Sequence, residues 1–238
     1  ITTDADIVLS AALTGTGTLT VSQSSVATTM GIGNAAAGTI NLTATEQGRI
    51  TNGWASLIFG RTDGTGAINL TANTWNDVLT LRSGSGVITV SGAQTMAANN
   101  LTITTDANIA VNAALTGTGT LTIGSTLTAT TYGLGTGQAG TIQWTNAEIA
   151  NITNGWGSLV FGNTAGTGAM NVGALTWNDI LTLRTAAGAK NINGTQTMGA
   201  NSLTITTDSN LALAVGANLT GTGTLTIAGQ SAATTMGL

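Results

Sequence analysis

The sequence predicts an all-β protein of the parallel β-solenoid class, in which short strands of successive turns stack on one another. Three observations support this prediction: a composition rich in threonine and glycine, a repeat of 102 residues, and a shorter rhythm of about 20 residues inside each repeat. Self-similarity at a fixed period is the sequence signature of stacked repeat architectures.

The composition favours strands over helices. Threonine is β-branched and suits a pleated, half-buried backbone, whereas each of the 34 glycines weakens a helix by about 1 kcal/mol relative to alanine. Proline, cysteine and histidine are absent. Without cysteine the chain can form no disulfide and carries no thiolate. Without histidine it lacks the usual general base and the commonest transition-metal ligand.

The charge of the chain limits the classes of molecule that it is expected to bind. The chain has five basic residues, counting lysine and arginine together, and nine acidic residues, which gives a net charge of −4. Because no basic patch or stripe is present, we expect no nucleic-acid partner. No apolar run approaches the ~18 residues of a membrane helix, so we also expect a chain that does not span a membrane.

The 102-residue repeat organises the chain. Residues 1–102 align on residues 103–204 without a gap, and 60 of the 102 positions are identical. The stretch "ITTDAD" at residue 1 returns as "ITTDAN" at 103 and "ITTDSN" at 205. We therefore predict one continuous solenoid of repeat 1 (1–102), repeat 2 (103–204) and a partial repeat 3 (205–238), as a segment of a longer array.

A shorter rhythm divides each repeat. Apolar–polar–apolar triplets recur in the second copy at intervals of roughly 20 residues. These triplets are Leu101–Ile103, Leu121–Ile123, Ile142–Trp144, Leu159–Phe161, Leu181–Leu183 and Leu203–Ile205. The intervals predict about five turns of ~20 residues per repeat, and a strand spacing of ~4.8 Å then gives a rise of roughly 24 Å per repeat.

The recurring stretch "TGTGTLTI" indicates which side chains point inward. Alternation places Leu121 and Ile123 in the core, with the threonines outward and the glycines in turns. Because equivalent positions of neighbouring turns lie one strand spacing apart, charged side chains would repel one another, which explains their scarcity. One such interval separates Trp54 from Trp75, and also Trp156 from Trp177, so we predict ring-on-ring stacks along one corner.

Three segments carry a resemblance to a known family. "NGWASLIFGRTDGTGAINL", "TWNDVLTLRSGSGVITVSG" and "LTITTDANIAVNAALTGTG" resemble the repeats of filamentous-haemagglutinin-like proteins, which are giant secreted surface proteins of bacteria. The resemblance extends over the whole chain, and its most specific parts are G-W-x-S-L-x-F-G and W-N-D-x-L-T-L-R. It implies a right-handed parallel β-helix that acts as a stalk, adhesin or fibre at the cell surface. Tandem immunoglobulin-like domains are the rival fold, but they predict no such short rhythm.

The acidic residues offer weak support for a catalytic or metal site. They are Asp4, Asp6, Glu46, Asp63, Asp77, Asp106, Glu148, Asp179 and Asp208. Most recur once per repeat, which separates the copies by far more than the ~5–10 Å that two-carboxylate chemistry needs, and calcium needs clustered oxygens. We expect these aspartates to cap turns. The chain is therefore predicted to be no enzyme and to have no catalytic, cofactor-binding or metal-binding residues and no cofactor.

The predicted function is structural. We expect an extracellular segment on a bacterial surface that associates with itself, end to end or laterally, into fibres, with cell-surface or host glycans as a further class of partner. One alternative is an ice-binding β-solenoid that uses threonine ladders, although aligned stretches such as "ASLIF" and "DVLTL" interrupt the T-x-T pattern. Another alternative is a carbohydrate-binding or carbohydrate-degrading β-helix.

Overall fold

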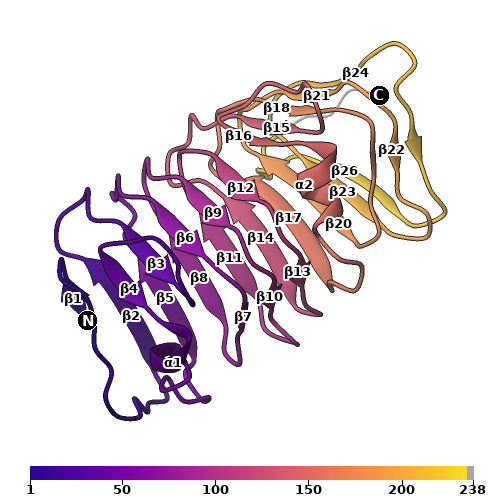
Figure 1. Ribbon diagram of the computed structural model, residues 1–238. Coiled ribbons are helices and arrows are strands. Elements are labelled where there is room, and N and C mark those ends of the chain that lie inside the picture. Colours follow the sequence, from indigo (N-terminus) through magenta and orange to yellow (C-terminus); the bar gives the residue numbers. More distant parts are fainter. Residues whose placement is uncertain (235–238) are drawn as a thin grey trace. The chain divides into compact units, whose positions relative to one another are not determined.

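The computed structural model describes residues 1–234, and it confirms the predicted all-β, parallel β-solenoid fold (Figure 1). The chain forms two compact units, residues 1–119 and residues 120–238. Within each unit the chain passes through three sheets in succession, and the strands of each sheet pair in parallel. The right-handed winding and the continuity of the solenoid from one unit to the next stay predictions.

The first unit contains three sheets and one short helix, α1 (Ala44–Gln47). Its first sheet contains, in spatial order, β1 (Thr2–Thr3), β2 (Thr18–Gln23), β5 (Ser56–Gly60), β8 (Leu79–Arg82) and β11 (Leu101–Thr104). Its second sheet contains β4 (Ile40–Leu42), β3 (Met30–Ile32), β6 (Ile68–Leu70), β9 (Ile88–Val90) and β12 (Ile109–Val111). Its third sheet contains β7 (Asn73–Thr74), β10 (Gln94–Thr95) and β13 (Leu115–Thr116).

The second unit repeats this plan around α2 (Asn146–Ala150). Its first-sheet strands are β14 (Thr120–Gly124), β17 (Ser158–Asn163), β20 (Leu181–Thr185), β23 (Leu203–Thr206) and β26 (Leu225–Ala228). Its second sheet contains β16 (Ile142–Trp144), β15 (Tyr132–Leu134), β18 (Met170–Val172), β21 (Lys190–Ile192) and β24 (Leu211–Leu213). Its third sheet contains β19 (Leu175–Thr176), β22 (Gln196–Thr197) and β25 (Leu219–Thr220).

The number of turns per repeat differs from the predicted value of about five. The first sheet of unit 1 passes in register through Leu19, Leu57, Leu79 and Leu101, so one period of the sequence makes four turns, and the turn from β2 to β5 is the long one. The triplet Ile142–Trp144, which the rhythm counted as a turn of its own, is β16 of the second sheet. Its counterpart β4 pairs with β3, the strand just before it in sequence. The long turn therefore adds a strand to the second sheet and none to the first.

A close backbone approach makes this short return possible. A Cβ atom on Gly38 would lie 2.1 Å from the backbone nitrogen of Gly31, and one on Gly140 would lie 2.2 Å from that of Gly133. No side chain fits at Gly38 or Gly140, so the connecting loop can fold back against the strand it has just left. The helix α1 then follows, held by a capping box between Thr43 and Glu46.

The core consists of columns of equivalent side chains. In the first sheet Leu57, Leu79 and Leu101 lie in register and are at most 4% exposed, and Thr80 and Thr102 between them face outward. In unit 2, Leu121 and Ile123 are fully buried while Thr122 is half-buried, which confirms the inward and outward assignment of "TGTGTLTI". Alternation of period two thus sets the core of both units.

The tryptophans do not form the predicted corner stack. Trp75 is 1% exposed, and its ring lies 5.7 Å from that of Phe59, while Trp177 is 2% exposed and lies 5.6 Å from Phe161. The ring of Trp54 instead covers Gly15, where an added Cβ would meet it at 2.2 Å. The aromatic partner of Trp75 and of Trp177 is therefore a phenylalanine of the first sheet, and Gly15, the first glycine of "TGTG" in repeat 1, makes room for an indole.

Candidate functional site

The two most specific sequence motifs meet across one turn of the solenoid. In unit 1 the carboxylate of Asp77, in "TWND", accepts a hydrogen bond from the backbone N–H of Gly53, in "TNGW", at 2.9 Å. In unit 2 Asp179 accepts the equivalent bond from Gly155 at 2.8 Å. Both glycines have φ near +120°, a backbone conformation that residues with a side chain rarely adopt. One hydrogen bond thus connects the two motifs in each unit.

The pKa of Asp179 reflects this position. Burial raises the pKa of its carboxyl above the ordinary value, and the N–H groups of Gly155 and Trp156 oppose the shift. Asp179 is 5% exposed and Asp77 is 6% exposed. Two buried carboxylates, one in each repeat, are therefore held by backbone donors at the same corner of the fold.

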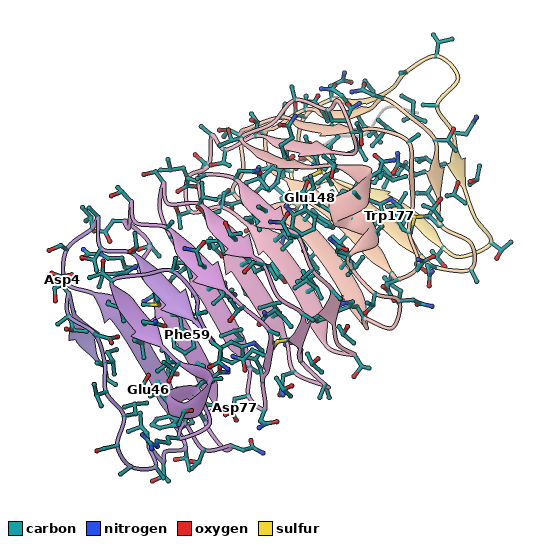
Figure 2. The ribbon with its side chains drawn as sticks, viewed as in Figure 1. Asp4, Glu46, Phe59, Asp77, Glu148 and Trp177 are labelled. Carbon is teal, nitrogen blue, oxygen red and sulfur yellow. The ribbon has the colours of Figure 1, made fainter. Side chains whose placement is uncertain are left out.

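A cleft opens beside this corner in each unit, and we call it the corner cleft. It arises because a helix, α1 or α2, stands beside an edge strand of the third sheet, β7 or β19, where a strand of the preceding turn would otherwise pair. The cleft of unit 1 has a volume of about 550 Å³, and that of unit 2 about 340 Å³. Figure 2 shows Glu46 and Asp77 near α1, and Glu148 and Trp177 near α2.

The two corner clefts differ, among other positions, at one pair on the helix and the edge strand. In unit 1 the side chain of Asn73, on β7, donates a hydrogen bond to Gln47, on α1. The equivalent residues of the second repeat are Leu175 and Ile149, and both line the cleft of unit 2. A polar pair in unit 1 thus corresponds to an apolar pair in unit 2.

The remaining acidic residues hold backbone and hydroxyl groups. Glu46 and Glu148 complete the capping boxes of α1 and α2. Asp4 accepts hydrogen bonds from the backbone and hydroxyl of Ser25, one turn later, and from the hydroxyl of Thr28. These bonds, of which that from the Ser25 hydroxyl is the strongest, lower the pKa of Asp4 to about 2. The expectation that aspartates cap turns is confirmed here.

The other aspartates lie at similar positions. Asp208 accepts bonds from Ser231 and Thr234, which lower its pKa. Asp6 accepts the backbone N–H of Asn41 at 2.8 Å. Asp63 forms an exposed ion pair with Arg61 at 2.6 Å, and Asp106 is half-buried at the repeat position that Asp4 occupies in unit 1. Sequence reasoning placed these residues at turns but missed their partners, most of which are a full turn away in the chain.

The corner clefts carry little reactive chemistry. Among the residues that line them, Asp77 and Asp179 are the ionisable ones, one in each cleft. Within residues 1–234, no group of three or more acidic side chains lies together as a metal would require. The buried indoles of Trp75 and Trp177 have no free face for a sugar ring, and the indole N–H groups donate to Gln94 and Gln196 of the next turn.

Each unit also has an open edge. In the spatial order of the first sheets, β1 is the outermost strand of unit 1 and β26 that of unit 2. Leu225 of β26 is 49% exposed, whereas its register partner Leu203 is 2% exposed. Leu213 of β24 is 47% exposed, and Ile192 beside it is fully buried. Among the residues that the structure describes, β26 pairs on one side only, with β23, and core-type side chains of this turn are exposed.

No helix in residues 1–234 is long and apolar enough to cross a membrane. Comparison of the chain with protein-family models, with curated proteins and with solved structures finds no match in any of the three.

Proposed function

We propose that the chain is a non-enzymatic structural segment of an extracellular fibre or adhesin stalk on a bacterial surface, of the filamentous-haemagglutinin-like kind. The observation that carries this proposal is the register. In all three sheets of each unit, equivalent side chains of successive turns lie directly above one another. Turns can therefore be added without any new type of contact, and stability grows with their number.

The open edges support assembly by the same contacts. A turn added beyond β26 would cover Leu213 and Leu225 and would pair the free edge of the strand. Each ladder hydrogen bond contributes roughly 1 kcal/mol net, so a long stack resists unfolding and proteolysis. The function follows from stiffness and length, for which no reactive side chain is needed.

Self-association of the purified chain tests this proposal. We expect wild-type particles to lengthen with concentration in sedimentation velocity and electron microscopy, and Leu225→Asp to abolish the growth by placing a charge in the stacking face. Leu127→Asp, at an exposed apolar residue of a turn, is the matched control and should leave growth unchanged. Equal association of all three proteins would contradict stacking at this edge.

The mass of the native polypeptide separates two forms of the proposal. A fibre made as one continuous chain gives a denatured mass far above the 23.4 kDa of these 238 residues, whereas a fibre of separate chains does not. The location is tested on intact bacteria. We expect an antibody against the chain to label the cells without permeabilisation, and labelling only after lysis would contradict a surface role.

Ice binding is a second candidate, because the outer face of the first sheet carries a row of threonines. Thr20, Thr80 and Thr102 occupy one outward row in unit 1, interrupted by Ile58. Thr122, Thr182, Thr204 and Thr226 occupy the row in unit 2, interrupted by Val160. The interruption once per repeat favours the stalk. Thermal hysteresis of the purified chain, reduced by Thr80→Leu, would favour ice binding instead.

A further inference from the structure

The chain contains one lysine, and it lies in the core. Lys190 opens β21 and is fully buried, with Met170 of β18 and Leu211 of β24 as its register partners in the same inward column. The equivalent residue of the first repeat, Ile88 of β9, is also fully buried. Repeat 2 therefore carries an amine where repeat 1 carries a hydrocarbon side chain, inside the same architecture.

The amine has a single neutral partner in this column. Its Nζ donates to the hydroxyl of Thr185 at 2.5 Å, and that buried hydroxyl donates in turn to the carbonyl of Gly188. A protonated amine has three donors, and burial of such a charge without a carboxylate is unfavourable. The pocket around Lys190 thus accommodates an uncharged amine far better than an ammonium group.

No acidic side chain of the described residues faces the amine. The flanking strands β18 and β24 carry no ionisable residue, and β20, which contributes Thr185, adds only the cation Arg184. Tyr132, two rows along the same column, donates its hydroxyl to Ser125. The acids of unit 2 are engaged elsewhere: Glu148 in the capping box of α2, Asp179 with Gly155, and Asp208 with Ser231.

We propose that the turn of unit 2 that contains Lys190 is a proton-linked weak point, which opens more readily as the pH falls because only the opened turn can hydrate the charged amine. Opening here means local separation of β21 from β18 and β24, with loss of their ladder hydrogen bonds. The proposal does not depend on the proposed fibre function, because it concerns the stability of one turn.

The pH range follows from the amine. Burial lowers the pKa of Lys190 from 10.5 to about 7. Between these values the opened turn binds a proton that the closed turn does not, so each fall of one pH unit raises the opening constant about tenfold. Below about pH 7 both forms are protonated, and the opening constant levels off at its highest value. The turn is therefore most stable in alkaline solution.

The composition makes this titration unusually easy to isolate. The chain has no histidine and no cysteine, the side chains whose ordinary pKa values lie between pH 6 and 9.5. A pH-dependent change that is confined to β21 and is lost in Lys190→Ile is therefore assigned to Lys190.

Hydrogen exchange of the full chain, measured by mass spectrometry from pH 6 to 9.5 and corrected for the intrinsic exchange rate, tests the proposal. We expect the opening constant of β21 to rise more than about a hundredfold from pH 9.5 to 7 and then to level off. The equivalent strand β9, with Ile88, serves as the internal control and should show no such dependence. Lys190→Ile should abolish the dependence in β21, and Lys190→Met provides a second variant of similar length.

Two results would overturn the proposal. One is a β21 opening constant that does not change with pH in the wild-type chain. The other is a pH dependence that persists in both Lys190→Ile and Lys190→Met. In the reverse experiment, Ile88→Lys should transfer the pH dependence to β9, and failure of a folded Ile88→Lys chain to show it would also count against the proposal.

Discussion

At the scale of single residues, the polar side chains of this chain connect one turn to the next. Asp77 and Asp179 hold the backbone of a glycine 24 residues earlier, and Asp4 holds Ser25, 21 residues later. The sequence shows that these aspartates recur, but their partners depend on which turns lie side by side. Because the prediction of five turns misplaced the neighbours, it could identify capping residues without identifying what they cap.

The corner pair provides the first prediction. Gln47→Ile alone leaves the amide of Asn73 without its partner, and Asn73→Leu alone leaves Gln47 without its own, so each should lower the free energy of unfolding by about 1–2 kcal/mol. The double variant reproduces the Ile149 and Leu175 pair of unit 2 and should recover most of the loss. Urea unfolding of the four proteins measures the coupling, and strictly additive losses would contradict contact between the two positions.

The Asp4 carboxyl provides the second prediction, on pH. Because its folded pKa is about 2, below the ordinary 3.8, its capping bonds stabilise the fold above about pH 4 and are lost as the pH falls through 2. NMR titration of the Asp4 carboxyl should give this low midpoint. In Ser25→Ala the midpoint should move upward, and an unchanged midpoint would show that the Ser25 hydroxyl is not the main cause.

At the scale of elements, the sequence rhythm predicted the strands of the first sheet and misread one of the second. The triplets of Leu101, Leu121, Leu159, Leu181 and Leu203 all begin inward-facing runs of the first sheet. The triplet that begins at Ile142 has the same alternation but belongs to the second sheet. Alternation reports which side chains face inward, and it does not report which sheet a strand joins, because all three sheets share one core.

The short return between β3 and β4 provides the third prediction. Gly38→Ala would place a Cβ atom 2.1 Å from the backbone of Gly31, so the loop must move and the pairing of β4 with β3 should weaken. We expect a loss of several kcal/mol of stability and faster hydrogen exchange in β4. Gly17→Ala meets nothing within 4 Å and is the control. Equal effects of the two substitutions would contradict the close packing of this loop.

At the scale of the whole molecule, the two units are built alike, because each has three parallel sheets and one short helix. From β11 to β21 the second repeat contains four strands of the first sheet, β11, β14, β17 and β20, and five of the second, β12, β15, β16, β18 and β21. For the proposed fibre, a spacing of ~4.8 Å predicts a rise per repeat of about 19 Å along the first sheet and about 24 Å along the second.

This mismatch provides the fourth prediction, which concerns the fibre. A fibre built from repeats like residues 103–204 should curve toward the first sheet, because this repeat has fewer strands in the first sheet than in the second. Cryo-electron microscopy of fibres should show a curved axis and an axial repeat between these two values. A straight fibre with equal rows on all sides would contradict the extra strand per repeat.

The register of the long turn from β2 to β5 is the central claim, and engineered cysteines test it most directly because the chain has none of its own. Thr20 and Ile58 are register partners on neighbouring strands, and a spacing of ~4.8 Å lies within the range that a disulfide can bridge. We predict that Thr20→Cys with Ile58→Cys forms an intramolecular disulfide in the folded chain, whereas Thr20→Cys with Asn41→Cys does not. A disulfide in the second pair and none in the first would show that all turns have the same short length.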